Sequence, residues 1–156
     1  MNLAVSLLLS LVPISELRGG IPYGYFNGLS LFLLYPLCTL MNALVAPICW
    51  LFLDTVHKVL YRQSWYKHFF NKTIERARRK VEPLVKKYEF WGLMVFVAVP
   101  LPMTGAWTGA IAAYLLQVPR HKALLSITVG VLVAGLIVSL VLLTGSSLGS
   151  ILIKRF

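Results

Sequence analysis

The stretch of sequence that decides the fold is Phe90–Gln117, FWGLMVFVAVPLPMTGAWTGAIAAYLLQ. It is apolar throughout, but the run from Pro100 to Gly105 interrupts it with two prolines, a threonine and a glycine. The leg on each side has roughly eleven residues, or about 16 Å of helix, which is half of the ~30 Å hydrocarbon core of a bilayer. Two legs of this length cannot each cross a membrane. The stretch therefore predicts a re-entrant helical hairpin over residues 90–118, which enters and leaves on the same side.

The overall composition agrees with a membrane location. The chain has 156 residues, of which 58% are hydrophobic and 13% charged, and its mean hydropathy is +0.79. A soluble domain has about a quarter of its residues charged. These values exclude a soluble monomer, a disordered chain and a disulfide-stapled miniprotein. We expect an all-α integral membrane protein with a single membrane domain over residues 1–156.

The order of a broken hairpin followed by an unbroken apolar span occurs twice. The tripeptide Val12-Pro13-Ile14 matches Val99-Pro100-Leu101 at an offset of 87 residues. One span separates the two hairpins, so they are expected to open to opposite sides of the membrane. The sequence thus predicts an inverted repeat, 1–53 and 90–156, whose two breaks meet near the midplane. In chain order the pieces are a hairpin at 2–28 broken over Pro13–Pro22, a transmembrane helix at 29–53, a hairpin at 90–118 and a transmembrane helix at 122–145.

The linker between the repeats, residues 54–89, carries most of the charge. From Thr55 to Phe90 there are ten basic and three acidic residues, which give +7 of the chain's net +10. In so apolar a chain this excess predicts a cytoplasmic loop of a multi-pass protein in the plasma or inner membrane, not a nucleic-acid partner. Apolar residues spaced by three and four predict that the linker is an amphipathic helix on the inner leaflet or against a partner copy. The alternative is a solvated basic linker that only sets the orientation. The apolar positions are Phe70, Ile74, Ala77, Val81, Leu84 and Tyr88.

The first break contains two charged residues. Glu16 is the only acidic residue outside the linker and its margins. An ionisable side chain at membrane depth costs at least about 2.5–3.5 kcal/mol, so its presence indicates a function. Arg18, beside the backbone amides of Gly19 and Gly20, suits a phosphate or a carboxylate. The alternative is that Glu16 and Arg18 only pair with each other.

The second break supplies hydroxyl groups and backbone amides at the start of a half-helix, an arrangement that favours anions. Asn42, in the middle of the first span, fits a hydrogen bond between helices or a place in the site, and packing is the preferred interpretation. His57, His68 and His121 lack the spacing of a metal site, and the sequence has no nucleophile–base pair or nucleotide-binding loop. We therefore expect no metal, no cofactor and no enzymatic activity. The predicted substrate- and ion-binding residues are Glu16, Arg18, Gly19, Gly20, Thr104, Gly105, Trp107 and Thr108.

The two breaks also carry a family resemblance. SELRGGIPYG at Ser15–Gly24 and PLPMTGAWTG at Pro100–Gly109 resemble the small multidrug export protein family over almost the whole chain. That family is similar to the DedA/VTT membrane proteins, which have paired re-entrant hairpins each followed by a transmembrane helix. The resemblance implies a DedA-like translocase, or flippase, for polyprenyl phosphate or a related lipid anion, coupled to a proton or another ion. Glu16 matches the acidic residue of the first hairpin, and Arg18 lies where the anion is handled.

Two other functions fit the sequence. In a proton-coupled exporter of lipophilic cations, Glu16 would exchange a proton for the drug, but the fixed positive charge of Arg18 weakens any cation site. In a membrane assembly or scaffold factor, the basic linker would recruit partners. We prefer the lipid phosphate, with membrane lipids as partners. A chain with so few helices cannot by itself bury two hairpins at the midplane, so we also expect a homodimer.

Overall fold

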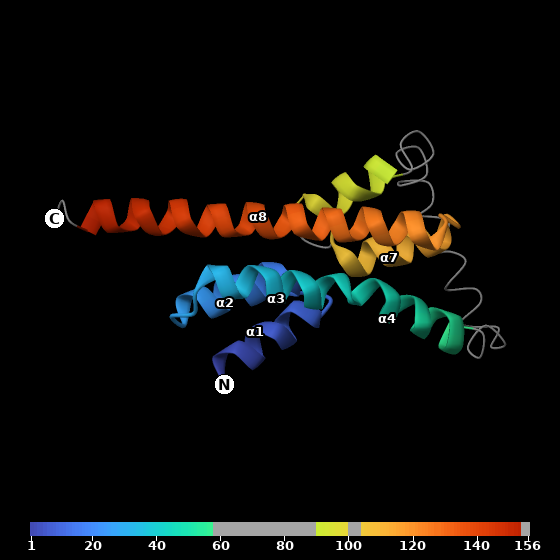
Figure 1. Ribbon diagram of the computed structural model, residues 1–156, viewed down its shortest axis with the longest axis horizontal. Helices are drawn as coiled ribbons and strands as arrows, with labels where there is room; N and C mark the ends of the chain where they lie inside the picture. Colours follow the sequence, from blue (N-terminus) through green and yellow to red (C-terminus); the bar gives the residue numbers. More distant parts are fainter. Residues whose placement is uncertain (58–89, 100–103, 154–156) are drawn as a thin grey trace.

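The computed structural model describes residues 1–57, 90–99 and 104–153, and side chains for residues 1–55, 90–99 and 104–145. Within these ranges every regular element is a helix, which confirms the all-α prediction. The predicted amphipathic helix of the linker falls largely on residues 58–89, outside the described part. In chain order the elements are α1 (Asn2–Leu11), α2 (Glu16–Phe26), α3 (Leu31–Ala43), α4 (Val45–Phe52), the π-helix η1 (Leu53–His57), a helix at 90–98, α7 (Ala106–Leu115) and α8 (Arg120–Ile153) (Figure 1).

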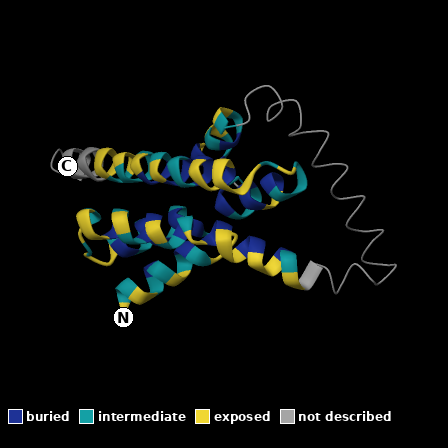
Figure 2. Ribbon diagram, turned by 45° about the vertical axis from the view of Figure 1, so that its right-hand side comes forward, coloured by how far each residue is buried: buried dark blue, intermediate teal, exposed yellow. Residues whose placement is uncertain are grey.

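Two helical runs are long and apolar enough to cross a membrane. The first, Leu31–Thr55, joins α3, α4 and the start of η1 into 25 residues, and its most apolar 18-residue window has a mean hydropathy of 1.9. The second, Arg120–Gly145, is a 26-residue part of α8 whose most apolar 18-residue window has a mean hydropathy of 2.7. Only 33% and 28% of their most apolar windows are buried, so most of their apolar surface faces outward, as lipid-facing helices require (Figure 2). They correspond closely to the predicted spans 29–53 and 122–145.

The first break is shorter than the sequence predicts. We expected a break from Pro13 to Pro22, but α2 begins at Glu16 and continues through Pro22. Proline inside a helix removes one backbone hydrogen bond, here the one to the carbonyl of Arg18, and the helix tolerates this loss. The expectation that the backbone amide of Gly19 is available to an anion is also wrong, because its N–H donates to the carbonyl of Ser15 at 3.1 Å.

Helices α1 and α2 pack through small residues. Ser6 and Ser10 of α1 are buried against Gly20 and Gly24 of α2, and a Cβ on Gly20 would lie 2.5 Å from the backbone oxygen of Ser6. The two serines are four residues apart along α1, and the two glycines are four residues apart along α2. Small residues at this spacing let two helix backbones approach closely, which is the main source of helix association where lipid removes the hydrophobic drive. Gly20 therefore lies in the contact between α1 and α2.

Helices α3 and α4 of the first half contact α7 and α8 of the second half. Buried alanines on one face of α7 let its backbone approach α4, where the indole N–H of Trp50 donates to the carbonyl of Ala110 at 2.9 Å. The hydroxyl of Tyr35 on α3 donates to the carbonyl of Leu132 on α8 at 3.2 Å. Near this point a Cβ on Gly135 would lie 2.6 Å from the methyl group of Thr39. Figure 1 shows α3 and α4 following one another alongside α8, with α7 beside α4 and α8.

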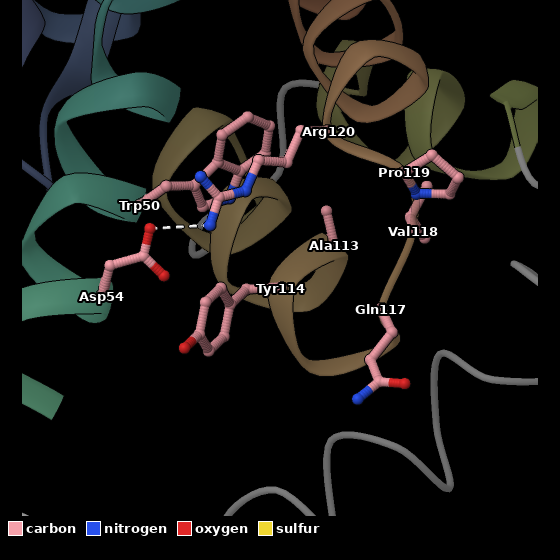
Figure 3. Close-up of a pocket in the computed structure, with 8 residues that line it drawn as sticks. All are labelled: Trp50, Asp54, Ala113, Tyr114, Gln117, Val118, Pro119 and Arg120. Atoms are coloured by element: carbon pink, nitrogen blue, oxygen red, sulfur yellow. Dashed lines mark hydrogen bonds and ion pairs between the residues drawn. The ribbon is translucent and has the colours of Figure 1, made fainter. Parts of the chain in front are cut away.

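A pocket of about 430 Å³ lies where α4, α7 and the start of α8 meet, at one end of both spanning runs (Figure 3). The Arg120 guanidinium and the Asp54 carboxylate form an ion pair of 2.7 Å at its rim. Their side chains are 67% and 32% exposed, so the pair contributes at most about 1 kcal/mol to stability. The pocket is lined by Trp50, Asp54, Ala113, Tyr114, Gln117, Val118, Pro119 and Arg120.

We predict that Gly20→Ala destabilises the protein by about 1–3 kcal/mol, because the new methyl group meets backbone atoms of α1 that cannot move aside. The matched control is Gly145→Ala in α8, where a Cβ meets nothing within 4 Å. The control should be neutral or stabilising by up to about 1 kcal/mol, since alanine is the better helix former. Thermal unfolding in mild detergent measures both changes, and equal melting temperatures for the two variants would contradict the α1–α2 packing.

Candidate functional site

The end of α1 and the start of α2 contact the start of α7 and the residues that precede it. Arg18 donates from Nη2 to the carbonyl of Val99 at 3.1 Å and to the hydroxyl of Thr104 at 3.4 Å. The indole N–H of Trp107 donates to the carbonyl of Leu11, the last residue of α1, at 2.9 Å. Residues more than eighty positions apart in the sequence are thus joined by directed hydrogen bonds between the two halves.

The carboxyl group of Glu16 lies at the N-terminus of α7. Its Oε1 accepts the backbone N–H of Trp107 at 3.3 Å, and the carboxyl also interacts with the backbone N–H of Ala106. The first backbone N–H groups of a helix have no partner within the helix, and the residue before α7 is Gly105, which has no side chain to cap them. Glu16 therefore supplies the cap from the other half of the chain, and its negative charge lies at the positive end of the α7 dipole.

Gly105 makes this approach possible. A Cβ at this position would lie 2.5 Å from the carboxyl carbon of Glu16, well inside van der Waals contact. The backbone of Gly105 is extended (φ 161°), a conformation open to any residue, so the requirement for glycine is one of space. Any larger residue would displace the Glu16 carboxylate from the end of α7.

The backbone of Glu16 adopts an unusual conformation. Its φ of +50° lies in the left-handed region, which costs about 1–2 kcal/mol for a residue with a Cβ. The left-handed residue turns the chain from the break into α2, and its side chain is 5% exposed. Strained residues of this kind persist where surrounding contacts hold them, and they concentrate at functional sites.

The charges of Glu16 and Arg18 attract each other, and both side chains also contact the other half of the chain. Thr104 links the two contacts of Arg18, because its hydroxyl donates to the same Val99 carbonyl at 2.9 Å. The site therefore combines one negative group, one positive group and several polar donors. Burial disfavours the charged form of the Glu16 carboxyl, whereas the α7 amides and Arg18 favour it.

Five of the eight predicted site residues come together here, and three do not. Thr108 donates its hydroxyl to the carbonyl of Gly105 within the first turn of α7, at 3.3 Å. Gly19 packs against Ser15, and Gly20 packs against α1. In the described part, no three His, Cys, Asp or Glu side chains are placed to hold a metal ion. The residues that meet are Glu16, Arg18, Thr104, Gly105 and Trp107.

Sequence reasoning assigned Asn42 to packing, but the structure places it in the site. Asn42 lies on α3, is 1% exposed, and its side chain hydrogen-bonds the carboxyl of Glu16. The signal was present in the sequence, since a lone amide in the middle of an apolar span needs a polar partner. What the sequence did not show was which face of α3 turns toward the break.

The family described as "Putative small multi-drug export protein" matches residues 16–137, well over half of the chain. The chain belongs to this family. No curated protein and no solved structure matches it. The matched region begins at Glu16, and the groups that act on its carboxyl in the described part (Arg18, Asn42, Ala106 and Trp107) all lie inside it.

We predict that Gly105→Ala lowers the free energy of unfolding by about 1–3 kcal/mol, because it expels the Glu16 carboxylate from the end of α7. The cost should be much smaller when Glu16→Ala is already present, since the colliding group is then absent. Chemical denaturation of the wild type, both single variants and the double variant gives the coupling directly. Additive effects would contradict the proposed cap.

Proposed function

We propose that this member of the multi-drug export family is a proton-coupled transporter of an anion, with a phosphate-bearing lipid such as polyprenyl phosphate as its substrate class. One observation carries the proposal. The carboxylate of Glu16 occupies the N-terminus of α7, and the positive charge of Arg18 acts on it. The same donors and the same positive charge would bind the phosphate of a substrate.

The protonation state of Glu16 would decide which anion the site holds. When ionised, Glu16 fills the site, so a second anion meets both occupied amides and like charge. When protonated, it no longer has the negative charge that the end of α7 favours. The N–H groups of Ala106 and Trp107, together with Arg18, are then available to a phosphate. A proton and an anion would enter the site together, and neither would remain stably without the other.

The proposal also includes the arrangement in the membrane. Helices α1 and α7 each have 10 residues, about 15 Å of helix, and neither is long enough to cross. They suit re-entrant hairpins that enter from opposite faces as an inverted repeat, with Glu16 near the midplane. The basic linker 54–89 would lie on the cytoplasmic side of the inner membrane. A second copy would cover the irregular backbone at the breaks, as a homodimer.

A second candidate function, proton-coupled export of lipophilic cations, is favoured by the family's description and by the buried carboxylate of Glu16. In that mechanism the cation would take the place of a proton on Glu16. Arg18 opposes it, because its positive charge lies close enough to act on the same carboxyl. We therefore place the anion first.

We predict that phosphate-bearing lipid binds the reconstituted protein more tightly as the pH falls. In Glu16→Gln, a neutral mimic of the protonated acid, tight binding should persist at every pH. Arg18→Ala should weaken binding about tenfold or more, because it removes charge-assisted hydrogen bonds. The matched control is Arg120→Ala at the rim of the pocket in Figure 3, which should leave binding unchanged. Fluorescence quenching of a labelled polyprenyl phosphate in proteoliposomes measures all four proteins.

Other outcomes distinguish the alternatives. Proton-driven uptake of a lipophilic cation such as ethidium, lost in Glu16→Gln and improved in Arg18→Ala, would establish the exporter instead. A scaffold factor would tolerate both substitutions and fail only when basic residues of the linker are neutralised. Absence of phosphate-lipid binding by the wild type at every pH would refute the anion proposal.

A further inference from the structure

Asn42 contains a buried polar atom, next to the proposed site, that the proposed transport cycle leaves unexplained. Its side chain hydrogen-bonds the Glu16 carboxyl, yet its own Oδ1 has no hydrogen-bond partner within the described ranges. The residue is 1% exposed, so this oxygen is also shielded from solvent. A buried acceptor without a donor is costly and calls for an explanation in the function of the protein.

The chemistry of the two groups explains the orientation. An ionised carboxylate only accepts hydrogen bonds, so it must face the NH₂ of the amide, and the amide oxygen then points away. A protonated carboxyl carries an O–H group, which can donate a hydrogen bond to the amide oxygen. A half turn of the amide about its last side-chain bond exchanges one arrangement for the other without moving the backbone of α3. The observed orientation, with the oxygen unpaired, is the one that an ionised Glu16 requires.

We propose that Asn42 is a positioning residue that responds to the protonation of Glu16 by turning its amide. With Glu16 ionised, Nδ2 donates to the carboxylate. With Glu16 protonated, the carboxyl O–H donates a hydrogen bond to Oδ1, and the NH₂ group points where the oxygen had been, which adds a donor on the side of the site that lacked one. The inference rests on the proposed function, in which Glu16 is the residue that takes up the proton.

Few other groups can drive this change. The charged groups that act on the Glu16 carboxyl within the described part are Arg18, from its own helix, and the positive end of α7. Helix α1 contains no titratable side chain, and the polar contact from α3 is Asn42 itself. Arg18 and the α7 amides favour the ionised form only, whereas an amide that turns can bond both forms.

The test is an infrared titration of the full-length protein, following the carboxyl C=O band that disappears in Glu16→Gln. Asn42→Leu should raise the pH of half-protonation by about one unit, a tenfold change. A hydrogen bond to a charged group is stronger than one to a neutral group, so the ionised form loses more. The band should also shift in position, because the carboxylic acid loses its acceptor. A role in packing alone would not move the band.

The matched control is Thr39→Val, one turn earlier on the same helix. Thr39 is 3% exposed, and its hydroxyl bonds to its own helix at Pro36, 3.1 Å away. We expect the wild-type midpoint and band in this variant. A second substitution, Asn42→Asp, keeps the size of the side chain and brings two carboxyl groups together. These should share a proton and hold it to a higher pH than the wild type does.

The results separate this inference from the proposed function. If both Asn42 variants titrate with the wild-type midpoint and band, the turning amide is wrong, whatever the protein transports. If Asn42→Leu does not fold, a wild-type titration in Asn42→Asp alone overturns it. The proposed function fails on a different measurement, a pH dependence of phosphate-lipid binding that survives in Glu16→Gln, and that result leaves the infrared shifts unaffected.

Discussion

The rest of the structure depends on one interaction, the Glu16 carboxylate at the N-terminus of α7. It joins the two halves where α2 and α7 begin, and it places a negative charge where the dipole of α7 favours it. Several otherwise unrelated features follow from it. The left-handed backbone of Glu16 aims the side chain, Gly105 leaves room for it, and Asn42 supplies a donor from a third helix. All three features therefore act on the same carboxylate.

Packing around this interaction relies on small residues. Serine and glycine bring α1 onto α2, and alanine brings α7 onto its neighbours. Lipid is as apolar as leucine, so large apolar side chains gain little from contacting each other in a bilayer, whereas close backbone contact gains dispersion energy. Many large apolar side chains of α3, α4 and α8 are exposed, among them Phe32, Leu51 and Leu140, and Figure 2 shows exposed stretches along these helices. A closely packed interior lets a buried charge find fixed partners at short range.

The all-helical fold and the two long apolar helices were predictable, because long uncharged runs stand out in the sequence, and the lone charges of Glu16 and Arg18 stand out within it. The face that each helix turns inward was not. A membrane helix is apolar on all sides, so the periodicity that identifies the core face of a soluble helix is absent. For that reason the sequence predicts Gly20 in the site and favours packing over a place in the site for Asn42. The continuation of α2 through Pro22 was missed because proline normally signals an end, and only neighbouring helices make its presence tolerable.

The Glu16 carboxylate also acts as a ligand that cannot diffuse away. A group tethered beside its binding site competes at an effective concentration that short linkers set in the millimolar range or above. Any free anion that reaches the N-terminus of α7 must displace this carboxylate. The apparent affinity of the anion is therefore lower than its intrinsic affinity, by a factor set by how strongly the tethered carboxylate occupies the site. Under the proposed function, weak binding at neutral pH is therefore what this geometry requires of a substrate, and the electrochemical gradient of protons would decide on which side of the membrane the carboxylate withdraws.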